Sequence, residues 1–427
     1  MATRRGFIKG SGLALIGVGL AGGIPAFAMK AALWKKKIGP YKKTQTLVCI
    51  FQRGAMDGLM AVTPFTDNNL MVARPNLFMT AAAGLAGGNA PLIDLDGRFG
   101  LHPMFKGFEP LFRDGRLAIV HGIGSPNNTR SHFDAQDYME SGTPFNKGTS
   151  SGWLNRAAGL IPSEQKTPFQ AVSLTSALPR SFYGDTPCIA ISNLQDFALQ
   201  LRGNPMSIKS ASTSFEDLYD QTTPGLLQQA GKESFDAIKL LKQSDIKNYQ
   251  PANQAVYPST ALGNALKQIA QLIKMDVGLE VAFAEHGGWD THFNQGTATG
   301  IFANNAADLS NSITAFWTDL GSYQDEVVVM TMTEFGRTVH QNGTGGTDHG
   351  RASCNFILGN KVRGGKVHGN VLALAVENLE EGRDLAVTTD FRSVFSEVAD
   401  NHLGINDDHV LFPDWAGSRI GVMKKPD

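Results

Sequence analysis

The feature that most constrains the fold is a regular alternation of short apolar runs with amphipathic helical patterns. Residues 45–52 (QTLVCIFQ) and 326–332 (EVVVMTM) are short, apolar and partly β-branched, as buried strands are. Residues 302–320 repeat large apolar side chains at three- and four-residue steps, which places them on one helical face. This alternation predicts an α/β fold with a mostly parallel central sheet flanked by helices on both faces. Further strands are predicted at 116–124, 170–174, 187–192, 279–285 and 354–359, and further helices at 263–275 and 389–403.

The N-terminal segment predicts export. Residues 1–28 begin with the paired arginines Arg4 and Arg5, continue through a short apolar stretch and end in Ala26-Phe27-Ala28. These features are typical of a signal peptide, and the paired arginines indicate the twin-arginine export machinery. The alternative is an uncleaved anchor, which a short, glycine-rich run disfavours because a stable span needs about 20 apolar residues. We therefore expect a periplasmic or secreted protein with no stable membrane span after processing.

The rest of the chain divides by composition. Residues 29–43 hold six lysines and predict an exposed basic leader. Residues 44–427 carry the α/β pattern, and residues 195–260 within them are polar, rich in Gln, Ser and Lys, and predict a helical insertion. The formal net charge of −1 gives no reason to expect a nucleic-acid partner.

Acidic and histidine side chains gather directly after several predicted strands. Asp57 follows 45–52, Asp290 and His292 follow 279–285, and Asp348 and His349 follow 326–332 in the motif GGTDHG. Ligands of α/β sheets bind at the carboxyl ends of strands, so these groups would converge if their strands are neighbours. Carboxylate and imidazole ligands suit Zn²⁺ or Mn²⁺ better than Ca²⁺. Their number predicts two divalent ions about 4 Å apart, an arrangement that clamps a phosphoryl group during displacement.

Two further segments bear on this site. Ser131 stands where a helix begins, so it either caps that helix or, beside a metal, acts as a nucleophile. Arg130 would then hold phosphate oxygens in a bidentate pair, and His132 either contacts substrate or merely begins the helix. Glu334 and Arg337, in TEFGRT, either form an ion pair without a catalytic role or orient the metal ligands. The glycines of GTGGT (343–347) would let the backbone bring the Asp-His pair close to a metal.

Five motifs in chain order resemble one exported protein family. They are RGAMDGL, NTRSHFDAQDYMESG, GGWDTH, TEFGRT and GGTDHG. The chain is similar over nearly its whole mature length to the domain of unknown function 1501 family, itself similar to the alkaline phosphatase and sulfatase superfamily. The resemblance implies an alkaline-phosphatase-like domain over residues 44–427. It also implies one metal held by Asp57, Asp348 and His349 with the Ser131 oxygen, and a second metal held by Asp290, His292 and His368.

Two departures from the superfamily pattern refine this expectation. The superfamily commonly spaces the first Asp and His four apart, whereas Asp290 and His292 are two apart and His286 lies four before Asp290. We expect His292 to be the ligand, because a spacing of two places both side chains on one side of an extended segment. Residues 125–130 (SPNNTR) lack the C/S-x-P-x-R spacing of sulfatases.

The sequence therefore predicts an exported metal-dependent hydrolase that acts on phosphate esters, either small molecules or polymers. Two alternatives stay open. One is a sulfatase-like hydrolase on the same fold. The other is a non-catalytic secreted or envelope binding protein.

Overall fold

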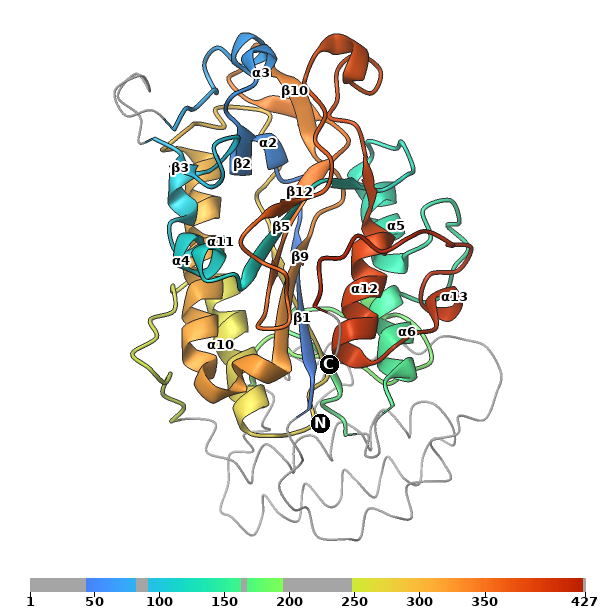
Figure 1. The fold of residues 1–427 in the computed structure, drawn as a ribbon. Coiled ribbons are helices and arrows are strands. Elements are labelled where there is room, and N and C mark those ends of the chain that lie inside the picture. The colour runs from blue at the N-terminus through green and yellow to red at the C-terminus, as the bar shows by residue number, and fades with distance from the viewer. Residues whose placement is uncertain (1–43, 82–90, 163–166, 195–247, 425–427) are drawn as a thin grey trace, which may run out of the picture.

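The computed structural model describes residues 44–81, 91–162, 167–194 and 248–424 (Figure 1). The predicted signal peptide (1–28), the basic leader (29–43) and residues 195–247 of the predicted insertion lie outside the described residues. Residues 248–260 are described, and they contain no helix or strand.

A nine-stranded sheet runs through the molecule with β1 (Thr46–Gln52) near its middle (Figure 1). β8 (Val281–His286) and β9 (Val327–Met332) pair with β1 on its two sides, and both are parallel to it. The strand order is β13-β5-β12-β9-β1-β8-β6-β7, with β14 paired to β5, and β12 is antiparallel to both of its neighbours. The mostly parallel sheet predicted from the sequence is confirmed. The remaining strands are β5 (Leu117–Gly124), β6 (Ala171–Ser173), β7 (Ile189–Ala190), β12 (Ser353–Leu358), β13 (Val367–His368) and β14 (Thr389–Asp390).

Helices cover both faces of the sheet because β1 is apolar on both. Val48 and Ile50 pack into one hydrophobic cluster, whereas Leu47, Cys49 and Phe51 pack into another on the opposite face. The first face is covered by α4 (Phe108–Arg113), α10 (Ala261–Lys274) and α11 (Ile301–Leu320). The second is covered by α5 (His132–Ser141), α6 (Trp153–Leu160), α12 (Phe391–Leu403) and α13 (Asp408–Leu411). Among the described residues, no helix combines the length and apolarity needed to cross a bilayer.

Short elements gather beyond the carboxyl end of β1, at the top of Figure 1. β9 is followed by an antiparallel hairpin of β10 (Arg337–Gln341) and β11 (Thr347–His349). β1 is followed by α2 (Gly58–Ala61), β2 (Val62–Pro64) and α3 (Asn68–Ala73). A small sheet joins β2 to β3 (Ile93–Asp94) and β4 (Phe99–Leu101). Short 3₁₀ helices lie at Pro103–Phe105, Arg180–Phe182, Gly321–Glu326 and Val376–Asn378.

Candidate metal centre

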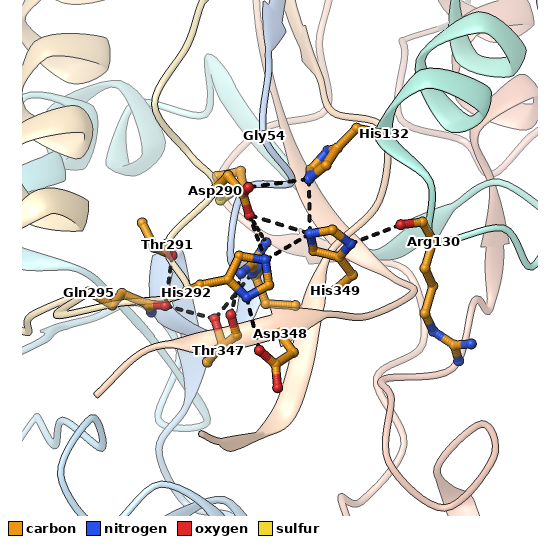
Figure 2. A network of polar contacts seen from close by, with 12 residues as sticks. Gly54, Arg130, His132, Asp290, Thr291, His292, Gln295, Thr347, Asp348 and His349 are labelled. Atoms are coloured by element: carbon orange, nitrogen blue, oxygen red, sulfur yellow. Dashed lines mark hydrogen bonds and ion pairs between the residues drawn. The ribbon is translucent and has the colours of Figure 1, made fainter. Parts of the chain in front are cut away.

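Four side chains from three separate segments converge beyond the carboxyl ends of the central strands (Figure 2). His132 is the first residue of α5, Asp290 and His292 lie in the loop after β8, and His349 ends β11. Ligand atoms of His132, Asp290 and His349 all lie within 4.8 Å of one another. The fourth member joins them, because His292 Nε2 lies 2.9 Å from His349 Nε2 and 3.1 Å from an Asp290 oxygen.

Each imidazole points its Nε2 atom into the cluster and makes a polar contact outside it through its Nδ1 atom. The Nδ1 atom faces an oxygen acceptor in every case. The tautomer with its hydrogen on Nδ1 satisfies these contacts and leaves the lone pair of the inward Nε2 available to a metal ion. The pairs are His132 with Glu334 Oε1 (2.8 Å), His292 with Asp348 Oδ1 (2.9 Å), and His349 with the carbonyl of Arg130 (2.8 Å).

The geometry of the cluster fits a divalent metal ion. His349 Nε2 lies 3.0 Å from His132 Nε2 and 2.9 Å from His292 Nε2, and paired lone pairs at these distances repel one another. A cation bound between the nitrogen atoms would remove this repulsion, because each lone pair would then be attracted to the cation. Zn–N bonds of about 2.0–2.1 Å place tetrahedral ligand atoms about 3.3 Å apart, and the distances from Asp290 oxygens to the imidazoles are 3.1, 3.4 and 3.6 Å.

Glu334 orients His132 from a buried position. Its Oε1 accepts hydrogen bonds from His132 Nδ1 at 2.8 Å, from the Gly54 N–H at 2.8 Å and from Gln136 Nε2 at 2.9 Å. Burial opposes the ionised form, but the hydrogen bonds from His132 and Gln136 prevail and lower the pKa of Glu334. The same hydrogen bond from His132 to Glu334 raises the pKa of His132.

Arg337 holds Asp290 in the same way. Its guanidinium is buried, and Nη1 donates to Asp290 Oδ1 at 2.8 Å, while Nε donates to Thr347 Oγ1 at 3.3 Å. Burial works to raise the pKa of Asp290, but the hydrogen bond and charge of Arg337 lower it overall. The structure therefore does not pair Glu334 with Arg337. Each side chain contacts a different member of the cluster.

Two glycines permit close backbone contacts around β11, Gly346 with the loop after β8 and Gly350 with β10 of the same hairpin. A Cβ on Gly346 would lie 2.3 Å from the Thr291 carbonyl oxygen and 2.4 Å from His292 backbone atoms. A Cβ on Gly350 would lie 2.4 Å from the Arg337 carbonyl carbon. Both positions need glycine because the backbones touch. Glycine at position 346 therefore allows the loop after β8, which carries Asp290 and His292, to lie against the start of β11.

Three predicted metal ligands lie outside the cluster, and two of these, Asp57 and His368, make no contact with any of its members. Asp57 is buried in an ion pair with Arg74, at 2.8 and 3.1 Å, instead of facing the histidines. His368 lies in β13 opposite Val120 of β5, and its Nε2 contacts the Arg363 carbonyl at 2.8 Å. The structure therefore does not assemble the two-ion arrangement expected from the sequence.

The remaining predicted residues flank the cluster. Ser131 caps α5, with its Oγ 3.5 Å from the Asp134 N–H, and it is exposed. The Arg130 guanidinium pairs with Asp384 and Glu381, so carboxylates already occupy the donors expected to hold phosphate. Asp348 contacts His292 instead of joining the cluster directly, and its pKa is lowered by hydrogen bonds from Asn342 and His292.

The sequence does not single out His132 as a metal ligand. His132 fits both substrate contact and a helix start, because no strand end precedes it directly. The available signal was its place at the N-terminus of a helix, next to Ser131. His286, the alternative partner of Asp290, instead contacts Asp308 of α11 at 3.2 Å.

Several solved structures show an arrangement similar to this chain at low sequence identity. The periplasmic domain of EcEptC from Escherichia coli, a complex with Zn, is 10% identical with a TM-score of 0.37, covering 90% of each chain. The PsFucS1 sulfatase from Pseudoalteromonas sp. is 10% identical with a TM-score of 0.38, covering 93% of this chain and 75% of its own. Alkaline phosphatase from the Antarctic bacterium TAB5 is 10% identical with a TM-score of 0.27, covering 75% of this chain and 93% of its own.

A search of curated proteins finds no match. The family described as "Protein of unknown function (DUF1501)" matches residues 118–412, which include all four members of the cluster. That match spans well over half of the chain. The chain therefore belongs to this family.

Proposed function

We propose that this protein is a metal-dependent hydrolase of phosphate esters whose metal is held by His132, Asp290, His292 and His349. The observation that carries the proposal is the convergence of three Nε2 atoms and a carboxylate, with every Nδ1 already bonded to an acceptor. Three imidazoles and one carboxylate suit Zn²⁺ or Mn²⁺ better than Ca²⁺, which prefers oxygen ligands.

Ser131 is our proposed nucleophile. It is exposed, immediately precedes His132, and accepts only a long hydrogen bond of 3.5 Å from the helix it caps. A divalent ion held by these residues would polarise a phosphoryl oxygen and lower the pKa of a nearby hydroxyl once its coordination expands beyond the four protein ligands. The hydroxyl oxygen would bond to phosphorus as the ester P–O bond breaks, and the serine proton would pass to the departing alcohol. Water would then break the serine O–P bond, returning a proton to Ser131 and releasing phosphate.

The other residues would keep the centre in shape. Glu334 and Asp348 hold the imidazole rings of His132 and His292 by their Nδ1 atoms. Arg337 fixes the Asp290 carboxylate. We also propose export by the twin-arginine route to the periplasm or beyond, on the strength of residues 1–28.

Metal content and turnover, measured together, test the function. The wild-type protein, His349→Ala and Ser131→Ala are supplied with Zn²⁺ or Mn²⁺ and assayed on p-nitrophenyl phosphate, its diester and its sulfate analogue. We expect His349→Ala to lose metal and activity, and Ser131→Ala to keep metal but lose activity. His340→Ala is the matched control, because His340 is an exposed histidine on the adjacent β10.

Four results would contradict the proposal. Turnover in His349→Ala equal to wild type would remove the metal from the mechanism. Full activity in Ser131→Ala would remove the nucleophile. Tight metal binding with no turnover of any ester would favour a binding protein, and turnover of the sulfate alone would replace the phosphate ester as substrate.

A further inference from the structure

The carboxylate of Asp57 lies in a closed shell of hydrogen-bond donors. Met60 N–H lies 3.2 Å from Oδ1, and Gln295 Nε2 lies 2.7 Å from Oδ2. Arg74 adds two donors, Nη1 at 2.8 Å and Nη2 at 3.1 Å. A carboxylate offers about four lone-pair sites, and these four donors fill them. Asp57 therefore has no oxygen lone pair left for a metal ion.

The guanidinium of Arg74 is fixed by backbone carbonyls of β10 as well as by Asp57. Its Nε donates to the Val339 carbonyl at 2.9 Å, and its Nη2 donates to the Thr338 carbonyl at 2.8 Å. The side chains of Arg74 and Asp57 are 2% and 1% exposed. An arginine keeps its charge at any physiological pH. Arg74 thus places a permanent positive charge on Asp57 from the end of α3 and the edge of β10.

Asp57 is linked to the metal centre through other hydrogen bonds, part of which Figure 2 shows. Gln295, which donates to Asp57, accepts the Thr347 hydroxyl at 2.7 Å. Thr347 Oγ1 accepts Arg337 Nε at 3.3 Å, and Arg337 Nη1 holds Asp290 at 2.8 Å. Asp57 is thus connected to Asp290 through Gln295, Thr347 and Arg337. None of these three side chains carries a negative charge that would attract a second metal ion.

The charges around the cluster balance one divalent ion. Three carboxylates, Asp290, Asp348 and Glu334, contact the cluster, and one guanidinium, Arg337, offsets one of them. With neutral imidazoles this leaves two negative charges. The Arg74–Asp57 pair adds none. A second divalent ion would add two positive charges next to a buried guanidinium, which is costly in a partly desolvated site.

We infer that this centre takes a single divalent cation, and that Arg74 supplies at Asp57 the positive charge that the family resemblance assigned there to a metal ion. The inference rests on the metal site proposed above and sets its stoichiometry. Arg74 and Asp57 contact no member of the cluster. They pair with each other, and Asp57 reaches the cluster only through Gln295 and Thr347.

Metal stoichiometry of the full chain tests the inference without reference to activity. The protein is freed of metal, titrated with Zn²⁺ alone in a calorimeter, and analysed for bound zinc by mass spectrometry after dialysis. We expect one equivalent in wild type and none in His349→Ala. The double variant Asp57→Asn/Arg74→Met removes both buried charges together, so we expect it to bind one equivalent with a Kd within about twofold of wild type.

A single variant keeps the test decisive if the double variant folds poorly. Asp57→Asn leaves the Arg74 charge without its carboxylate, so its melting temperature should fall. The folded fraction, checked by circular dichroism, should still hold one zinc. Two equivalents in wild type, or loss of zinc from folded Asp57→Asn, would overturn the single-ion inference while leaving a metal-dependent hydrolase standing. No zinc in wild type would overturn the proposed function, and the inference with it.

Discussion

Replacing Glu334 with glutamine should weaken metal binding while the fold survives. The Oε1 atom accepts three hydrogen bonds, and an amide oxygen in its place can accept the same three. The Oε2 atom lies 3.2 Å from the Thr333 hydroxyl, which can accept from an amide N–H. The substitution therefore keeps the shape of the contact and removes its charge.

The expected size of the effect follows from the position of Glu334 behind His132. Its side chain is 0% exposed, so solvent does not screen its interaction with the imidazole. Loss of a carboxylate that orients a metal-binding histidine typically costs about 10- to 100-fold in metal affinity, or about 1.4–2.7 kcal/mol. The neutral amide is the poorer acceptor for the Nδ1 hydrogen, so the Nε2 lone pair becomes less basic.

Calorimetric titration of the metal-free protein with Zn²⁺ measures this change. Glu397→Gln is the matched control, because Glu397 is another buried glutamate but binds the backbone N–H groups of Ile420, Gly421 and Met423. We expect the control to lose thermal stability and keep its zinc affinity. The reasoning is refuted if Glu334→Gln, folded as judged by circular dichroism, binds zinc with the wild-type Kd.

Three further outcomes follow from the structure. Zinc at about 100 times its Kd should raise the unfolding free energy by about 2.7 kcal/mol and the melting temperature by about 3 °C, and His349→Ala should show no such shift in calorimetry. Gly346→Ala should lower both stability and zinc affinity, because its Cβ meets the backbone of the loop after β8, whereas Gly343→Ala has nothing within 4 Å and should change neither. Burial lowers the pKa of His402 to about 4. In the unfolded chain the His402 imidazole binds a proton at about pH 6.5, so the stability present above this pH is lost as the pH falls toward 4. The expected loss at pH 5 is about 2 kcal/mol. Urea unfolding at pH 7 and pH 5 should show a smaller loss of stability in His402→Gln.

The sequence by itself determined the architecture and part of the candidate metal centre. The apolar runs at 45–52 and 326–332 became the adjacent strands β1 and β9, because hydrophobic periodicity is a local property that burial enforces. Asp290, His292 and His349 are candidates from the sequence because each follows a predicted strand, and the carboxyl ends of parallel strands gather at one edge of the sheet.

Only the tertiary structure decided which candidates meet. Asp57 follows a strand as its partners do, yet Arg74, 17 residues further along the chain, takes its oxygens. The His368 imidazole contacts the Arg363 carbonyl instead of the cluster. His132 reaches the cluster from the first residue of α5, so it lies on a helix and not directly after a strand. Position along the chain indicates which strand, helix or loop carries a side chain. Which charge or lone pair it faces depends on contacts between residues distant in sequence, and these the chain acquires only by folding.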